Sequence, residues 1–132
     1  MKKLKYLVLF LLLSSVAFAG GQREWKVLEI NASSNTLVSA PGAGKSIVLK
    51  NILFMTKNAL EMYGFTGSAA ALNKITNDFE FGANGGVSTS EWTTPMNIVL
   101  PPNTALQIWC SADPDTAMMY EYEILTFNDT NP

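Results

Sequence analysis

Residues 35–57, NTLVSAPGAGKSIVLKNILFMTK, decide the fold of this 132-residue chain. Within them, residues 39–46 (SAPGAGKS) differ at one position from the phosphate-binding loop G-x-x-x-x-G-K-[ST], whose backbone N–H groups and lysine hold nucleotide phosphates. Ser39 stands where that loop requires Gly. The run that follows, 47–55, is apolar and rich in branched residues, whereas the loop requires a helix facing the anion. The stretch therefore predicts a glycine turn and a core strand, and no nucleotide site.

The strand expected over 46–56 is apolar on both faces. With side chains alternating at a period of two, Val48, Ile52 and Phe54 share one face. A two-layer sandwich buries only one face of each strand. The second apolar face therefore predicts contact with another element or another subunit. We expect an oligomer interface formed by Ile47, Leu49, Leu53 and Met55.

Short strands separated by turn residues continue to the end of the chain. In 77–81, Phe79 and Phe81 are expected to point inward and Asp78 and Glu80 outward. Asn84-Gly85 predicts a β-hairpin, because both central positions of a type I′ turn need positive φ. The last strand, 118–127, has the clearest alternation, with one face expected in the core (Met118, Tyr120, Tyr122, Ile124) and one in solvent (Glu121, Glu123).

The number and spacing of these segments predict the fold class. Strands are expected over 24–30, 36–40, 46–56, a segment within 58–71, 77–81, 96–100, 104–111 and 118–127. About eight short strands with Gly, Pro and Asn at the joints are typical of an all-β antiparallel β-sandwich. We expect a jelly roll, with an immunoglobulin-like sandwich as the alternative.

The N-terminus predicts export. Lys2, Lys3 and Lys5 form a basic region, 6–18 an apolar core, and 17–19 a small-x-small cleavage site. The apolar core is shorter than the roughly 20 residues that span a bilayer as a helix. We expect 1–19 to be a cleaved signal peptide and 20–132 a single domain, located in the periplasm, outside the cell or in a virion. An uncleaved membrane anchor is the alternative.

The formal charge of the chain limits the classes of partner that it is expected to bind. Cleavage after residue 19 removes three of nine Lys and Arg and none of eleven Asp and Glu, which changes the formal charge from −2 to −5. Nucleic acids and anionic membranes both bind through Lys and Arg. We therefore expect no nucleic-acid partner, and membrane contact only through the signal segment.

The residue types argue against catalysis. The chain has no histidine, which removes Ser-His-Asp triads and histidine metal ligands. Cys110 is the single cysteine, in phase with Leu106 and Ile108, and is expected to be a buried, inert thiol. Asp113 and Asp115 could supply oxygens to Ca²⁺, but a turn is the simpler interpretation. We expect no enzyme, no catalytic residue, no cofactor and no metal site.

Two tryptophans are the candidates for ligand binding. Trp92 lies in a polar segment, and Trp109 is out of phase with the apolar residues of its strand. Exposed tryptophan is a frequent anchor at protein interfaces and on sugars. A tryptophan covered by a neighbouring loop is the alternative at both positions.

The order of segments resembles a known class of virion module. A Gly-Lys turn with an apolar strand (Lys45 to Ile52), an Asn-Gly turn (Ala83 to Gly86) and the segment Ile98 to Ile108 are similar in layout to small jelly-roll modules of bacteriophage virion proteins, which share the plan of tumour-necrosis-factor-like domains. The resemblance implies a homotrimeric structural or decoration role without catalysis. Tailed-phage virion proteins do not ordinarily carry a signal peptide, so residues 1–19 depart from the pattern.

Two functions follow from these expectations. The first is a structural subunit that forms a homotrimer, alone or with capsid, tail or fibre proteins. The second is a secreted monomeric module that binds carbohydrate or a cell surface through Trp92 or Trp109.

Overall fold

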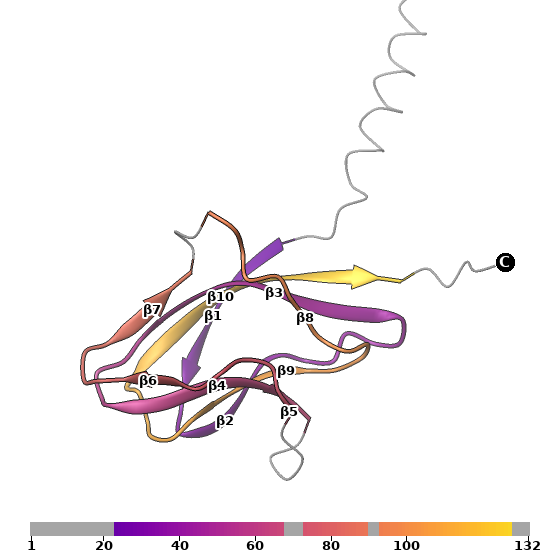
Figure 1. The fold of residues 1–132 in the computed structure, drawn as a ribbon. Helices are drawn as coiled ribbons and strands as arrows, with labels where there is room; N and C mark the ends of the chain where they lie inside the picture. Colours follow the sequence, from indigo (N-terminus) through magenta and orange to yellow (C-terminus); the bar gives the residue numbers. More distant parts are fainter. Residues whose placement is uncertain (1–22, 68–72, 90–92, 128–132) are drawn as a thin grey trace, which may run out of the picture.

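Two antiparallel sheets face each other in a sandwich (Figure 1). The computed structural model describes residues 23–67, 73–89 and 93–127, and all of its regular elements are strands. These are β1 (Arg23–Ile30), β2 (Ser33–Val38), β3 (Lys45–Met55), β4 (Leu60–Thr66), β5 (Asn73–Lys74), β6 (Phe79–Phe81), β7 (Gly86–Ser88), β8 (Ile98–Val99), β9 (Leu106–Cys110) and β10 (Thr116–Thr126). The predicted all-β antiparallel sandwich is confirmed.

The strand order is that of a jelly roll. The first sheet runs β1-β10-β3-β7, with β8 also paired to β3; the second runs β2-β9-β4-β5, with β6 also paired to β4. We call them sheet A and sheet B. Since β7 with β8, and β5 with β6, each occupy a single position beside one long strand, ten strands fill eight positions. From β1 to β4 the strands alternate between the sheets. β5 and β6 then stay beside β4 in sheet B, β7 and β8 lie in sheet A, β9 in sheet B and β10 in sheet A, which is the connectivity of a jelly roll.

A β-bulge in β3 sets which of its side chains reach the core. Along β10, Glu121 pairs with Asn51 but the next residue, Tyr122, pairs with Leu49, so Lys50 is the extra residue. Before the bulge Ile47 and Leu49 face inward, and after it Ile52 and Phe54 do. One inserted residue exchanges the faces of a strand. Ile47 and Leu49, from one nominal face of β3, and Ile52 and Phe54, from the other, thus fill one core.

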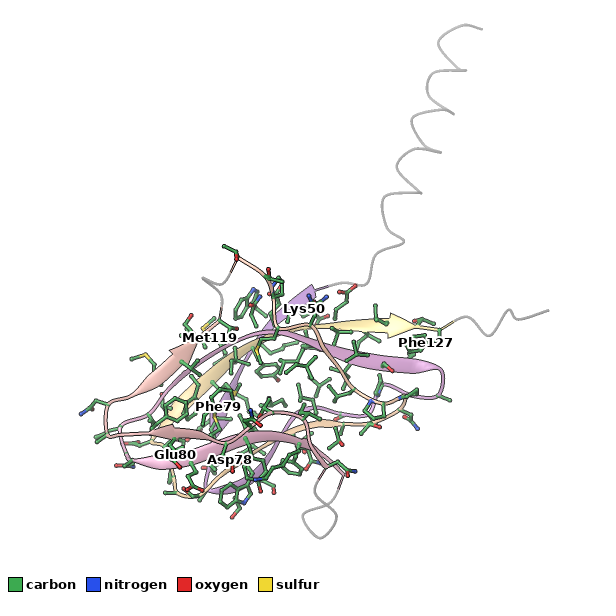
Figure 2. The ribbon with its side chains drawn as sticks, in the orientation of Figure 1. Lys50, Asp78, Phe79, Glu80, Met119 and Phe127 are labelled. Carbon is green, nitrogen blue, oxygen red and sulfur yellow. The ribbon has the colours of Figure 1, made fainter. Side chains whose placement is uncertain are left out.

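The core lies between the sheets and is built from both. Its buried members include Ile30 from β1, Met118 and Tyr120 from β10, and Met62 and Leu106 from sheet B. As expected, Phe79 and Phe81 pack against it. Figure 2 shows Phe79 directed between the sheets, whereas Asp78 and Glu80 lie on the outer side of sheet B.

The Asn84-Gly85 turn does not form the expected hairpin. It is a tight turn closed by a bond from the Gly85 N–H to the Gly82 carbonyl (3.0 Å), with Asn84 at φ 60°. The strand before it, β6, pairs with β4 in sheet B, and the strand after it, β7, pairs with β3 in sheet A. The turn therefore carries the chain from one sheet to the other.

The 39–46 segment is a turn between β2 and β3. Gly42 and Gly44 have positive φ, 101° and 69°, and the Lys45 N–H donates to the Gly42 carbonyl at 3.3 Å. The Asn103 side chain accepts from the Gly42 N–H at 3.0 Å. Because β3 begins directly at Lys45 in place of a helix, this segment lacks the phosphate-binding geometry.

Candidate functional site

The outer face of sheet A carries exposed apolar side chains. Val27, Met119 and Leu53 are direct cross-strand neighbours on β1, β10 and β3. Trp25 and Met55 lie on the same strands, two residues from Val27 and Leu53. Val27 and Met55 are 64% and 61% exposed, Trp25 45% and Met119 37%. Figure 2 shows Met119 on the side of sheet A away from the core.

These five residues, Trp25, Val27, Leu53, Met55 and Met119, are called the outer patch below. The solvent face of a sandwich is ordinarily polar, and scattered single apolar residues on it have no special meaning. Neighbouring apolar residues across three strands form a contiguous surface, which is typical of an interaction site. The sequence of β1 already indicates an apolar outer surface, because this strand is apolar on both faces. Trp25 and Val27 lie on one face, and Leu28 and Ile30 on the other.

The expected interface residues divide between the core and this surface. Ile47 and Leu49 are 0% and 3% exposed and belong to the core cluster. Their expected outward position is wrong, because the bulge at Lys50 reverses the phase of the strand. Leu53 and Met55 lie on the outer face as expected. Whether the chain forms an oligomer stays a prediction.

A buried polar strip adjoins the outer patch. The Asn51 side-chain amide donates to Glu121 at 2.6 Å, and the Thr89 hydroxyl donates to the Asn51 side-chain oxygen at 3.3 Å. At the bulge, the Lys50 ammonium contacts the Glu123 carboxylate at 3.1 Å and donates to the Asn97 side-chain oxygen at 2.8 Å. Glu121 is 7% exposed, and the Glu123 side chain 15%. Both glutamates lie on the outer face of β10 as expected, but the expectation that they are exposed to solvent is wrong.

Of the two candidate tryptophans, Trp92 and Trp109, the structure describes one. Trp92 lies outside the described residues. Trp109 lies half-buried on β9, where its ring stacks on Tyr63 with centroids 5.0 Å apart. The Lys74 ammonium sits over the other partner of this stack, 4.1 Å from the Tyr63 ring centre. Trp109 thus has a packing role on sheet B, and ligand binding by either tryptophan stays a prediction.

Cys110 is buried as expected, and it is 1% exposed. Burial, with a smaller contribution from the charge of Asp113, raises the pKa of its thiol to about 11. A thiolate is the reactive form of cysteine. This thiol is therefore unsuited to act as a nucleophile at neutral pH.

The Asp113–Asp115 segment is held by local contacts. The Asp115 N–H donates to the Asp113 side chain at 2.9 Å, and the Asp115 carboxylate pairs with Lys57 at 2.8 Å. Lys57 lowers the pKa of Asp115 through this hydrogen bond and its charge. Within 23–67, 73–89 and 93–127, no three acidic or cysteine side chains group in a way that could hold a metal ion.

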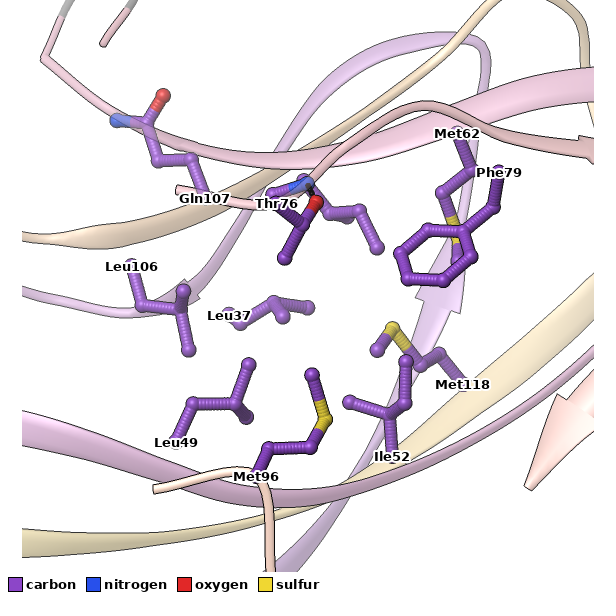
Figure 3. Close-up of a pocket in the computed structure, with 12 residues that line it drawn as sticks. Leu37, Leu49, Ile52, Met62, Thr76, Phe79, Met96, Leu106, Gln107 and Met118 are labelled. Atoms are coloured by element: carbon purple, nitrogen blue, oxygen red, sulfur yellow. Dashed lines mark hydrogen bonds between the residues drawn. The ribbon is translucent and has the colours of Figure 1, made fainter. Parts of the chain in front are cut away.

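A small cavity between the sheets is a packing void. Its volume is about 20 Å³, and its lining is almost wholly apolar, with Leu37, Leu49, Ile52 and Met118 among the side chains drawn in Figure 3. A space of this size holds at most one water, which would need polar partners. The void is therefore too small for a ligand.

A larger cleft opens at one end of the sandwich. Its volume is about 410 Å³, and it lies between β1 and β10 of sheet A and the end of β2. Lys26, Tyr120 and Tyr122 line it from sheet A, and Ser39, Pro41 and Lys45 from the β2–β3 connection and the start of β3. No sequence pattern indicates this cleft, since its lining residues are far apart in the chain.

The predicted leader, residues 1–19, lies outside the described residues. Among those described, no helix is long and apolar enough to cross a membrane.

Comparison with known proteins identifies no family. No family model matches the chain, and no curated protein matches it. A chain in the structure of infectious bursal disease virus, Gx strain, is similar at 14% identity and a TM-score of 0.34, over 86% of this chain and 34% of that one. The chain thus spans about a third of that protein. The fold assignment rests on the strand order and not on this loose superposition.

Proposed function

We propose that this chain is a non-enzymatic structural subunit that assembles with copies of itself, as a trimer, in a virion-type decoration or fibre or in an exported surface layer. The observation that carries the proposal is the outer patch on sheet A. Its members come from three adjacent strands, so they are held in one rigid plane. Aromatic residues and methionine are enriched at protein interfaces, and Trp25, Met55 and Met119 make up most of the patch.

A second copy is the partner that fits this surface best. Beside the patch, β1 pairs with β10 on one edge only, among the described residues. An unpaired edge of eight residues next to an exposed apolar face is a site for association with another chain. Burying the patch between protomers removes its apolar surface from water, which is the source of the stabilisation.

The thiol and several of the carboxylates described above have structural roles, which supports a function without chemistry. The Cys110 thiol is buried and has a raised pKa. Glu121 and Glu123 are engaged by Asn51 and Lys50, and Asp115 by Lys57.

The test is the solution mass of the protein recovered from cells that express the full chain, measured by light scattering during size exclusion. The wild type is expected as a trimer and Met119→Lys as a monomer with an unchanged circular dichroism spectrum. Phe127→Lys is the matched control. Phe127 is equally apolar, 49% exposed and eight residues further along the chain, roughly 26 Å at the rise of a strand.

A monomeric wild type would overturn the proposal. A trimer that persists in Met119→Lys, or one that Phe127→Lys also disperses, would remove the outer patch as the interface. Figure 2 shows that the two residues lie toward opposite ends of sheet A, so their effects are separable.

A further inference from the structure

The open cleft of about 410 Å³ has the size of a small-ligand site. Its two charged lining residues are both lysines, Lys26 and Lys45, and no carboxylate lines it. Lys45 has no side-chain partner among the described residues. The lining thus combines two ammonium groups with two tyrosine rings, those of Tyr120 and Tyr122.

The rim of the cleft already shows how it would hold a carboxylate. One oxygen of Glu24, Oε2, contacts the Lys26 ammonium at 2.9 Å and accepts a hydrogen bond from the Tyr122 hydroxyl at 3.1 Å. The side chains of Lys26 and Glu24 are 50% and 42% exposed. An exposed ion pair of this kind is weak, so a carboxylate from outside can compete for the same two donors.

The floor of the cleft is rigid and apolar. The Tyr120 hydroxyl donates to the Leu37 carbonyl across the sandwich, which fixes this ring between the sheets. The Tyr122 ring stacks beside it, with centroids 6.1 Å apart. Ser39, at the opposite wall, is exposed and offers a hydroxyl. Tyr120 itself is only 4% exposed, so a ligand ring with one apolar face can lie against the partly buried Tyr122 while its polar groups reach the walls.

The protonation states suit an anion. Burial raises the pKa of Tyr120 and of Tyr122, and the charge and hydrogen bond of Glu24 raise that of Tyr122 further. The hydrogen bond and charge of Glu24 also raise the pKa of Lys26. At neutral pH both phenols therefore keep their protons and Lys26 its charge, so the wall groups Lys26 and Tyr122 are hydrogen-bond donors.

We propose that this cleft binds a carboxylate-bearing sugar, with the carboxylate between Lys26, Lys45 and Tyr122 and the ring against the exposed part of Tyr122. The carboxylate of the sugar displaces that of Glu24. The site is separate from the outer patch, which lies on the opposite face of sheet A, so sugar binding and self-assembly can each occur without the other.

The experiment is a calorimetric titration of the protein recovered from full-chain expression with methyl glucuronide. Two matched probes separate the contributions. Methyl glucoside keeps the ring and lacks the carboxylate, and acetate keeps the carboxylate and lacks the ring. We expect saturable binding of the glucuronide and at least tenfold weaker binding of both other probes.

Three variants test the assignment of roles. Lys45→Ala and Tyr122→Phe are expected to weaken glucuronide binding at least threefold, because each removes one donor. Glu24→Gln is expected to strengthen it severalfold, because the competing carboxylate is gone while the side-chain shape is kept. Lys74→Ala, a lysine on sheet B, is the control and should leave binding unchanged.

Each result decides the proposal. No saturable glucuronide binding by the wild type and by Glu24→Gln would overturn the site. Equal affinity for acetate would overturn the sugar assignment, and unchanged or weaker binding by Glu24→Gln would overturn the displacement of its carboxylate. The solution mass of Lys45→Ala should equal that of the wild type, which keeps this test independent of the one for assembly.

Discussion

The side-chain amide of Asn51 donates a 2.6 Å hydrogen bond to the carboxylate of Glu121, seventy residues further along the chain, and both side chains are buried. The two residues are direct partners on β3 and β10, immediately beside the β-bulge. They therefore connect the two long central strands of sheet A at the point where β3 is irregular.

Replacing Glu121 by Ala is expected to lower the free energy of unfolding by about 2 kcal/mol, because it leaves a buried amide without its acceptor. Glu121→Gln keeps the size and one acceptor oxygen and should cost less. Urea denaturation followed by circular dichroism measures both. Glu80→Ala, at an exposed position of β6, is the control and should change stability by less than about 0.5 kcal/mol. Equal losses for Glu121→Ala and Glu80→Ala would contradict the role of the pair.

Deleting Lys50 is expected to keep a cooperative fold. The deletion removes the bulge residue, so β3 becomes a regular strand in which Ile47, Leu49, Ile52 and Phe54 still share the inner face. Lys50→Ala keeps the number of residues and loses only the contacts to Glu123 and Asn97, at an expected cost of about 1–2 kcal/mol. Thermal unfolding is expected to show a sharp transition for both variants. A deletion variant without a sharp transition would refute this account of β3, because the deletion should keep the phase of the strand.

Gly86→Ala is expected to destabilise the fold by about 1–3 kcal/mol through overpacking. A Cβ at this position would clash with the backbone oxygen of Phe54 on β3, the strand with which β7 pairs. Gly82→Ala is the matched control, because a Cβ there meets nothing within 4 Å. Its stability should be equal to the wild type or slightly higher, since alanine restricts the unfolded chain. Chemical denaturation of both variants provides the comparison, and a Gly86→Ala protein as stable as Gly82→Ala would contradict the close approach.

The Cys110 thiol should resist alkylation by iodoacetamide in the native protein and react fully in denaturant. With a pKa of about 11 in place of 9.0, its thiolate fraction at pH 8 is roughly a hundredfold smaller even before access is considered. Mass spectrometry of the labelled protein counts the modification. Rapid labelling of the folded chain would show that the thiol is accessible.

The raised pKa of Cys110 also predicts that the free energy of unfolding depends on pH. Between pH 9 and 11 the unfolded chain loses the Cys110 proton while the folded chain keeps it, so this contribution to stability is present below pH 9 and falls as the pH rises toward 11. The slope is at most about 1.4 kcal/mol per pH unit. Cys110→Ala should show a shallower fall over this range, and an identical profile would exclude the thiol as its source.

The fold class could be predicted because its signals are local. The alternation of Met118, Tyr120 and Tyr122, and the turn residues around Pro41 and Asp113, each act within a few residues. The bulge was not predictable, because an extra residue in a run that is apolar on both faces leaves no mark in the pattern. The wrong assignment of Ile47 and Leu49 to the interface follows from that one extra residue, Lys50.

The remaining differences between the expectations and the structure arise from pairing between residues that are far apart in the chain. The turn signal at Asn84-Gly85 is real, but a turn does not specify whether the next strand joins the same sheet. Likewise Glu121 alternates as a solvent residue does, and only its partner Asn51 explains its burial. Of the outer patch, Leu53 and Met55 were predicted, whereas the open cleft combines residues near positions 26, 45 and 122 and had no sequence signal.

The pairing of β1 with β10 has a mechanical consequence. The strands are antiparallel neighbours, with Arg23 opposite Glu123 and Ile30 opposite Thr116, so the start of β1 lies beside the end of β10. Tension applied at these two points would break the hydrogen bonds between the strands one after another, as in opening a zipper, and would not load them together in shear. In an assembly under tension, this chain would therefore be most stable when neighbouring copies are held through their sheet faces and not through the start of β1 and the end of β10.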